Sequence, residues 1–440
     1  MKQLLKKLIP ETTPLRLLFH RTKALVAALR YGFPAKKLTV IGITGTDGKT
    51  TTVGMIAHIL NANGIKSGAL STAFFQIGET VTWNPTQKTS PSPFIVQQFL
   101  RECVESKCTH VVLECSSHGL LQGRVSFTWP MVAGITNISE EHLDYHGTMD
   151  EYLKAKSVLF QMLRKNSGVS VLNADDRSYE KLQNIASPWK IDYSTKRSFQ
   201  KPESDKTCAL WIENGKAETG RVYGTLHSNV EETAYEIEIP VSGFFNLNNA
   251  LCAVGSTHAV NVQLADSVHA LATFKGIPGR MERVDAGQAF PVYIDFTVTP
   301  QSYESTLSTL KASLKPNGKL LVLTGSCGDR MKEKRPLVGK IVSSYADIMV
   351  VANEDPYTED PQKIIDEVWA GIDQTKTEAH RIFDRLEAIK FLLKKAQKDD
   401  ILIFCGKGSD TTMWVKSGQI PWNEREIVKE ELGRLGGKEN

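Results

Sequence analysis

The chain has 440 residues, enough for about two to four domains of ordinary size, which excludes a peptide or a single small module. With 41% hydrophobic and 23% charged residues, its composition excludes both a disordered chain and a bundle of membrane spans. The formal net charge is +4, but residues 1–40 hold nine Lys and Arg residues against one acid, Glu11, so the remainder carries a net charge of −4. A nucleic-acid-binding protein more often spreads its basic excess over a folded face. We therefore expect an enzyme-like body that binds no nucleic acid and carries a basic N-terminal arm.

The N-terminal arm, residues 1–38, alternates basic residues with apolar ones. Its uncharged stretch, residues 24–29, is too short for a signal-peptide core or a membrane span. Two interpretations stand side by side: residues 1–37 form an amphipathic helix that contacts an anionic membrane surface peripherally, or a helix that packs its apolar face on the body. Seven cysteines, an odd number without a CxxC pair, predict reduced thiols and a cytoplasmic protein.

From residue 37 onward, short apolar runs alternate with helical stretches, which predicts a parallel sheet with crossover helices. The first predicted strands are residues 38–44, 110–115, 131–137 and 169–173. Residues 207–243 alternate apolar and polar residues in three β-rich segments, 208–213, 221–227 and 233–241, and predict a small antiparallel excursion before a helix over about 247–260.

After the turn at residues 276–279 the strand and helix rhythm restarts. Strands are predicted at residues 292–296, 320–323, 348–352 and 401–404. The fold class is therefore α/β, with a central P-loop ATPase domain of mostly parallel sheet over residues 39–280 and a Rossmann-like C-terminal domain over residues 281–440.

The strongest single motif is VIGITGTDGKTTT at residues 40–52, a strand that enters a glycine turn and then a helix. Backbone N–H groups of such a turn (Gly45, Thr46, Asp47 and Gly48) and of the helix start at Thr51 point toward a bound phosphate. Lys49 adds a compact positive charge, and the Thr50 hydroxyl can reach Mg²⁺. The strict GxxxxGK[ST] spacing is not met, because Ile43 occupies the first glycine position. A structural glycine turn is the alternative.

Polar residues follow two further predicted strands. Glu114 ends the run VVLE, where a carboxylate faces the crevice at the carboxyl end of the sheet and can be a second Mg²⁺ ligand. His142 follows the next strand, in a segment with two imidazoles and several carboxylates, although a single histidine is more often a hydrogen-bonded loop residue. A P-loop alone permits a kinase, a GTPase or an ATPase.

Seven blocks in this order resemble the Mur ligase family: TGTDGKTTT, ECSSHGLLQGR, TNISEEHLDYHGTMDEYLKAKSVLF, LNADD, GFFNLNNAL, IPGRMERV and GSCGDRMKEKRP. The resemblance covers residues 39 to about 430 and is strongest to its MurE group, which adds the third amino acid of the peptidoglycan stem to UDP-N-acetylmuramoyl-L-alanyl-D-glutamate. It implies an ATP-dependent, ADP-forming ligase in peptidoglycan precursor synthesis. A substrate carboxylate attacks the γ-phosphate of ATP, and an amine then displaces phosphate from the acyl phosphate.

The resemblance also implies roles for single residues. Lys49 contacts the β- and γ-phosphates, Thr50 and Glu114 hold a first Mg²⁺, and His142 takes part in holding a second. Lys156 matches the family's carbamylated lysine, whose carbamate supports that second ion. The adenine contacts match Asn246 and Asn249, and the contacts to ATP from the C-terminal domain match Arg280 and Asp295.

Two further sets match the substrate sites, and we expect a monomer that acts on small molecules. The muramoyl dipeptide would be held by Thr89, Ser90, Ser116, Gln122 and Arg124. The incoming amino acid would be held by Glu354, Asp355, Tyr357, Gly406 and Asp410.

Three departures from the family pattern matter. Tyr357 replaces the arginine of DNPR that binds the distal carboxylate of diaminopimelate, so the nearby acids favour L-lysine or ornithine. A diamino acid bound through other residues is the alternative. Val298 replaces the histidine of DYAHTP. The P-loop begins about forty residues into the chain, so we expect the usual N-terminal UDP-binding domain to be lacking.

The last departure keeps alternatives open. One is a Mur-type ligase for a carrier without UDP, similar to folylpolyglutamate synthase or acting on a lipid-linked precursor. Another is a nucleotide-binding subunit that needs a partner, and a generic P-loop kinase is third.

Overall fold

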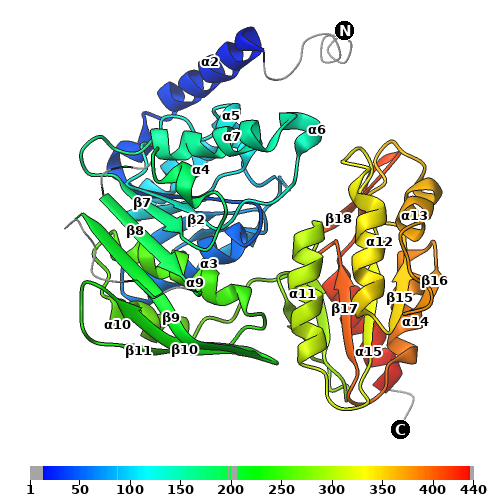
Figure 1. The fold of residues 1–440 in the computed structure, drawn as a ribbon. Coiled ribbons are helices and arrows are strands. Elements are labelled where there is room, and N and C mark those ends of the chain that lie inside the picture. Colours follow the sequence, from blue (N-terminus) through cyan, green and yellow to red (C-terminus); the bar gives the residue numbers. More distant parts are fainter. Residues whose placement is uncertain are drawn as a thin grey trace.

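The protein is described by a computed structural model for residues 13–86, 88–185, 187, 189–196, 198–199 and 206–436. The first twelve residues of the basic arm lie outside this description. The described chain forms two α/β domains, each built on its own sheet (Figure 1). The α/β fold class predicted from the sequence is confirmed.

The central domain contains a sheet with the strand order β11-β10-β9-β8-β7-β6-β1-β5-β2-β3-β4. Its strands are β1 (Thr39–Thr44), β2 (Ser67–Leu70), β3 (Phe74–Ile77), β4 (Thr80–Trp83), β5 (His110–Glu114), β6 (Val132–Ile135), β7 (Val169–Asn173), β8 (Trp189–Ser194), β9 (Thr207–Glu218), β10 (Arg221–Ser228) and β11 (Tyr235–Ile239). Its helices are α2 (Pro14–Arg30), the 3₁₀ turn η1 (Pro34–Lys37), α3 (Lys49–Ala62), α4 (Pro93–Glu105), α5 (Ser117–Leu121), α6 (Leu143–His146), α7 (Met149–Gln161), α8 (Tyr179–Leu182), α9 (Phe245–His258) and α10 (Leu264–Leu271).

The middle of this sheet is parallel, with β1 between β5 and β6. Successive side chains of β1 enter different cores, because a strand's side chains alternate between its two faces. Ile41 and Ile43 pack with α3 and α9, whereas Val40 packs with α4 and α7. Burial on both faces explains why the parallel strands are continuous apolar runs in the sequence.

The β-rich segment after residue 206 differs from its prediction. β9, β10 and β11 pair antiparallel with one another, as expected, but β9 also pairs parallel with β8. The three strands therefore extend the central sheet instead of forming a separate excursion. At the other edge, β2, β3 and β4 form an antiparallel meander that the sequence did not predict, because each strand has only four residues.

The C-terminal domain has the strand order β12-β13-β17-β14-β15-β16 and a separate β18–β19 hairpin. Its elements are β12 (Glu282–Val284), β13 (Val292–Asp295), α11 (Pro300–Ala312), β14 (Leu320–Thr324), α12 (Lys334–Tyr345), β15 (Ile348–Val351), α13 (Pro361–Trp369), β16 (Glu378–Arg381), α14 (Arg385–Lys395), β17 (Ile401–Cys405), β18 (Thr412–Val415), β19 (Gly418–Pro421) and α15 (Glu424–Gly436). One face of the sheet packs on α11, α12 and α13, and the other on α14 and α15. The sequence missed β16, whose residues EAHR form a half-exposed edge without an apolar run.

Helix α2 packs against α4 through small residues, since Ala24, Ala27 and Ala28 are fully buried. Five larger apolar residues of the helix, Leu18, Phe19, Leu25, Val26 and Leu29, are exposed, so only part of its apolar surface packs on the body as expected. No helix in the described part of the chain is long and apolar enough to cross a bilayer. The structure contains seven free cysteines and no disulfide among them.

Candidate active site

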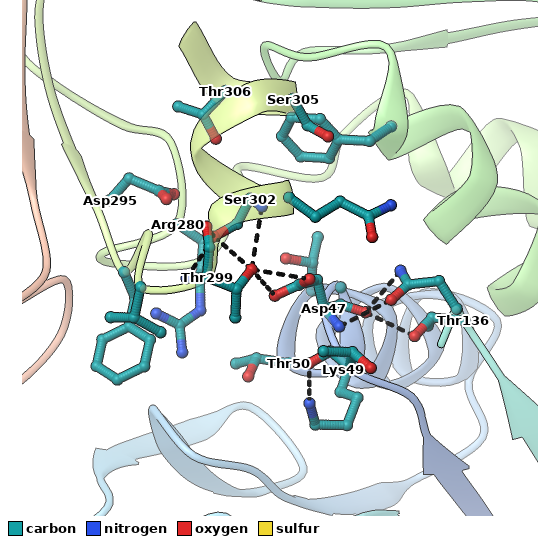
Figure 2. A pocket seen from close by; sticks show the side chains of 18 of the residues that line it. Asp47, Lys49, Thr50, Thr136, Arg280, Asp295, Thr299, Ser302, Ser305 and Thr306 are labelled. Carbon is teal, nitrogen blue, oxygen red and sulfur yellow. Dashed lines mark hydrogen bonds between the residues drawn. The ribbon is translucent and has the colours of Figure 1, made fainter. Parts of the chain in front are cut away.

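A cavity of about 720 Å³ lies between the two domains. It opens at the carboxyl ends of β1, β5 and β6, the usual position of a ligand in an open parallel sheet. Figure 2 shows residues of the P-loop facing α11 of the C-terminal domain across this cavity. The predicted residues that line it are Thr46, Asp47, Gly48, Lys49, Thr50, Thr51, Thr89, Glu114, His142, Asn246, Asn249, Arg280, Asp295, Asp355, Tyr357, Gly406 and Asp410.

Two glycines let the P-loop fit tightly against its neighbours. Gly45 and Gly48 have φ values of +142° and +81°, which side chains rarely adopt. A Cβ atom at Gly45 would collide with Thr136 Oγ1, and one at Gly48 would collide with Asn249 Oδ1. Only glycine therefore satisfies both the backbone and the packing at these positions.

Part of the loop's hydrogen-bonding capacity is already in use. The N–H groups of Thr46 and Asp47 donate to the backbone and side-chain oxygens of Asn137, at 2.8 and 3.0 Å. Lys49 Nζ donates to the carbonyl of Thr46 at 2.6 Å. The amides that remain for an anion include those of the first turn of α3, which begins at Lys49. This is a narrower set than the whole turn that the sequence suggested.

Glu114 and Thr50 form an oxygen-rich pair beside the P-loop. The Thr50 hydroxyl donates to Glu114 Oε2 at 3.0 Å, and the backbone N–H and hydroxyl of Thr72 donate to the same carboxylate at 2.6 and 2.9 Å. Glu114 is almost fully buried, and these three hydrogen bonds fix the orientation of its carboxylate. In the described part of the chain, no three His, Cys, Asp or Glu side chains gather as a metal site. The pair suits Mg²⁺, which binds proteins through one or two oxygen ligands and keeps waters and phosphate oxygens in its other positions.

Lys156 lies behind the P-loop and does not line the cavity. Its Nζ donates to the carbonyl of Gly45 at 2.5 Å and lies 4.4 Å from the centre of the Tyr152 ring. Burial, with the nearby charge of Lys49, lowers the pKa of Lys156 well below its ordinary value. Burial therefore disfavours the charged ammonium at this position.

His142 lines the cavity and is also held in its neutral form. Burial is the first cause that lowers its pKa to about 2, followed by His118, whose ring centre lies 4.8 Å away. A neutral imidazole keeps a lone pair on one ring nitrogen and so remains able to act as a ligand.

Asn246 and Asn249 lie on the first turn of α9 and line the cavity. Asn249 Nδ2 donates to Asn246 Oδ1 at 2.9 Å, and Asn246 Nδ2 donates to the carbonyl of Ser242 at 2.7 Å. Asn246 does not cap the helix, because the N-cap position belongs to Phe244. The spacing of three residues thus brings both amides together, as expected.

Arg280 and Asp295 form part of the opposite wall. Burial lowers the pKa of Arg280, while the charge of Asp295 opposes this shift. The guanidinium lies 4.3 Å from the centre of the Phe296 ring. Asp295 accepts a hydrogen bond from the Met281 amide at 2.6 Å and another from the Thr297 hydroxyl.

The two domains touch directly at the P-loop. The hydroxyl of Thr299, the N-cap residue of α11, lies 3.3 Å from Asp47 Oδ2, and Figure 2 shows this contact. A second contact joins Lys334 Nζ to Glu141 Oε1 at 3.3 Å. Lys334 also donates to the carbonyl of Val298 at 3.1 Å. Both contacts hold the C-terminal domain over the phosphate end of the cavity.

The acidic residues expected to bind an amino acid are already largely paired. Lys407 is fully buried and bridges Asp355 at 2.7 Å and Asp410 at 3.2 Å. Glu354 does not line the cavity; it packs against Gly406, and burial raises its pKa to about 7. Asp355, Asp410 and Glu354 therefore offer less negative charge to a ligand than three unpaired carboxylates would.

An arginine outside the predicted set of site residues lines the same cavity as Asp355 and Asp410. Arg330 lines the cavity with its guanidinium 5.3 Å from the centre of the Tyr357 ring, which stacks on Trp414 at 5.5 Å. Arg330 and Lys334 both lie in the GSCGDRMKEKRP block, which contained the signal for these two cations.

The expected acceptor residues form a hydrogen-bonded group beside the cavity, and of these only Thr89 lines it. Ser116 caps α5, and its amide donates to Ser90 Oγ at 3.0 Å. Arg124 donates to Gln122 Oε1 at 2.6 Å and to the carbonyl of Ser90 at 2.7 Å. These side chains are thus gathered in one place. They adjoin the phosphate end, because Ser90 Oγ donates to the carbonyl of Glu114 at 3.2 Å.

Comparisons with known proteins agree with this architecture. Residues 43–257 match the Mur ligase middle domain, and residues 279–408 match the Mur ligase glutamate ligase domain. Two similar curated proteins are named UDP-N-acetylmuramoyl-L-alanyl-D-glutamate--2,6-diaminopimelate ligase. The one from Caldanaerobacter subterraneus subsp. tengcongensis is 35% identical over 93% of this chain and 81% of its own length. The one from Geobacillus thermodenitrificans is 34% identical over 93% of this chain and 82% of its own length.

Solved structures give the same result for the fold. A structure of UDP-N-acetylmuramoyl-L-alanyl-D-glutamate--2,6-diaminopimelate ligase is 28% identical, with a TM-score of 0.62 over 91% of this chain and 79% of that chain. The MurF ligase from Thermotoga maritima in complex with ADP is 17% identical and has a TM-score of 0.66, covering 94% of this chain and 84% of that chain. At that identity the second likeness concerns the fold alone.

Proposed function

Since the chain belongs to the Mur ligase family, whose members are ATP-dependent, ADP-forming ligases of peptidoglycan synthesis, we propose that it performs the MurE-type reaction. In that reaction an amino acid is joined to a carboxylate of the D-glutamate in UDP-N-acetylmuramoyl-L-alanyl-D-glutamate. One observation carries the proposal: a single cavity unites the P-loop and Glu114 of the central domain with Arg280, Asp355 and Asp410 of the C-terminal domain.

The phosphate end of the cavity supports binding of ATP. The first-turn amides of α3 and the Lys49 ammonium offer donors and positive charge to the β- and γ-phosphates. Thr50 and Glu114 would hold Mg²⁺, which supplies charge neutralisation between two approaching anions. Arg280, on the facing wall, would balance the charge that develops as the acceptor carboxylate attacks the γ-phosphate. The incoming amine then attacks the acyl carbon, which forms the amide bond and releases inorganic phosphate and a proton.

We extend the proposal to a second Mg²⁺ held by His142 and a carbamate of Lys156. A neutral amine adds to CO₂ and releases one proton, which turns a basic side chain into an anionic oxygen ligand. The burial of Lys156 and its contact with the P-loop support this assignment, because an unmodified ammonium there would repel a metal ion. Mass spectrometry of the intact protein under CO₂ tests it, since a carbamate adds the mass of one CO₂ that is absent in Lys156→Met.

We further propose a diamino acid as the incoming amine. The Asp355, Lys407 and Asp410 network supplies polar oxygens for an ammonium, and Arg330 supplies a cation for a carboxylate. Because the charge of Lys407 compensates the negative charges of Asp355 and Asp410, these acids do not favour L-lysine or ornithine over diaminopimelate. Arg330 stands near Tyr357, the position at which the diaminopimelate motif carries its arginine.

The test is phosphate release from ATP with UDP-N-acetylmuramoyl-L-alanyl-D-glutamate and one amino acid at a time: L-lysine, L-ornithine or meso-diaminopimelate. Turnover that requires both the acceptor and one amino acid is expected. Arg330→Gln should raise the KM for meso-diaminopimelate more than the KM for ATP. Folded protein that binds ATP but is silent with the whole panel would refute the proposed acceptor and amine.

A further inference from the structure

Helix α2 carries five large apolar side chains on the outside of the protein. We define the α2 face by the exposed residues Leu18, Phe19, Leu25, Val26 and Leu29. Leu18, Phe19 and Leu29 expose 61, 64 and 60% of their surface. The helix meets the body through its alanines, so the usual orientation of an amphipathic surface helix is reversed. Such a contiguous apolar surface marks an interaction site more often than scattered single residues do.

Basic residues flank the α2 face on both sides. At about 100° per residue, its five apolar side chains fall within an arc of about 120°. Arg21 lies beyond one edge of this arc, and Lys23 and Arg30 lie beyond the other; all three are exposed. No acid occurs between residues 13 and 38. The charge of this surface therefore complements an extended anionic partner.

A basic and aromatic recess continues from the end of α2. It has a volume of about 320 Å³ and is lined by Ala35, Lys36, Trp129, Arg164 and Lys165. Lys36 Nζ lies 5.7 Å from the centre of the Trp129 ring, and Arg164 is anchored by donating to the carbonyl of Trp129 at 3.2 Å. Tryptophan together with Lys and Arg is typical of side chains at the headgroup level of a bilayer.

We propose that the α2 face and this recess dock the protein on the surface of an anionic lipid bilayer. The helix lies in the membrane plane, with its apolar residues at the boundary between headgroups and acyl chains and its basic residues against lipid phosphates. A second copy of the chain is a poorer occupant, because two basic faces repel each other. Figure 1 shows α2 on the outer side of the central domain, away from the C-terminal domain, so docking leaves the cavity between the domains uncovered.

The docking surface adjoins one side of the candidate active site. The side chain of Arg21 passes Gly123 so closely that a Cβ at Gly123 would contact its Cγ at 3.7 Å. Gly123 lies between Gln122 and Arg124, the residues expected to bind the acceptor. Docking would thus hold the acceptor side of the enzyme near the membrane, a consequence that rests on the proposed function.

The test is co-sedimentation of the full chain with sucrose-loaded vesicles of phosphatidylcholine containing phosphatidylglycerol, beside vesicles of phosphatidylcholine alone. The apolar variant replaces Leu18, Phe19, Val26 and Leu29 by Gln, a good helix former. The charge variant replaces Arg21, Lys23 and Arg30 by Gln. A matched control replaces three exposed lysines of the C-terminal domain, Lys376, Lys398 and Lys416, by Gln.

We expect the parent and the control to bind the anionic vesicles, and each α2 variant to bind at least about tenfold more weakly. The apolar variant loses apolar area that would be buried in the bilayer, and the charge variant loses basic residues that each contribute near an anionic surface. All changed residues are exposed, and circular dichroism and thermal unfolding verify that the fold is kept. The readout needs no catalysis, so its failure is distinct from failure of the proposed ligase reaction. If the parent protein does not bind anionic vesicles, the proposal is overturned, and a protein partner becomes the candidate for the α2 face. The proposal would also be overturned if the parent protein dimerised in the ultracentrifuge and the apolar variant did not. That result would show that the α2 face binds a second copy of the chain.

Discussion

The ion pair between Lys334 and Glu141 links the two domains, and its removal should weaken ATP binding. The two side chains are only 6 and 10% exposed, and their charged atoms lie 3.3 Å apart. Burial raises the pKa of Glu141, and the charge of Lys334 opposes that shift. Lys334→Met keeps an unbranched apolar stem but leaves the Glu141 carboxylate buried without its counter-ion.

The loss of ATP affinity depends on which arrangement of the two domains the unpaired Glu141 carboxylate destabilises. Removing one partner of a buried pair costs about 3–5 kcal/mol, and the residual exposure of both side chains favours the lower end. Glu141 regains water when the domains separate, so the cost is borne by the closed arrangement. Since about 1.4 kcal/mol is a factor of ten, the closed fraction should fall by up to about a hundredfold. The apparent affinity for ATP falls with that fraction.

The assay is titration calorimetry with a non-hydrolysable ATP analogue on Lys334→Met, Glu141→Gln and the double variant. Lys340→Met, an exposed lysine on the same helix, is the matched control. The double variant should recover most of the affinity, because no charge is then left unpaired. In Lys334→Met the pKa of Glu141 rises further in the closed state only, so closure takes up a proton and the affinity should improve as the pH falls.

A Kd for Lys334→Met within about threefold of the parent value would refute this reasoning. So would a coupling energy between the two substitutions below about 0.5 kcal/mol, the usual error of additivity for independent sites.

Three further outcomes are expected. Lys49→Ala should lower phosphate release by about a thousandfold or more, since a charge aimed at the reacting phosphates is lost, while the thermal unfolding curve stays unchanged; retained turnover would contradict its assigned role. Gly48→Ala forces a side chain at φ +81° against Asn249, so it should destabilise the loop by about 1–3 kcal/mol and weaken ATP binding in the same calorimetric assay. Burial raises the pKa of Glu354 from 4.5 to about 7, so the folded state holds a proton that the unfolded state releases, and the free energy of unfolding should fall by about 3 kcal/mol as the pH rises from 4.5 to 7. Urea unfolding of Glu354→Gln should lack this decline, and an unaltered pH profile would show that Glu354 is not its source.

The local elements of both domains could be predicted from the sequence because their signals are local. Parallel strands buried on both faces are continuous apolar runs, which is why β1, β5 and β7 were found within a residue or two of their bounds. The P-loop was found because a glycine turn, a lysine and two threonines must follow one another directly. Strands without such a signal, the edge strand β16 and the short β2–β4 meander, were missed.

Three properties follow from the amino-acid sequence alone, since each depends on neighbours within a few positions: the α/β class, the phosphate-binding loop and the residue types available to the site. The charges that remain available in the site depend instead on the tertiary structure. Lys407 pairs with Asp355 across about fifty residues of chain as well as with its neighbour Asp410, and Arg330 enters the same cavity from another loop. The tertiary structure also determines that α2, which contacts α4, buries its alanines and leaves Leu18, Leu25 and Leu29 exposed. The pairing of charges, the burial of side chains and the rotation of a helix depend on contacts between distant segments. The order of residues along the chain does not give the distances between those segments.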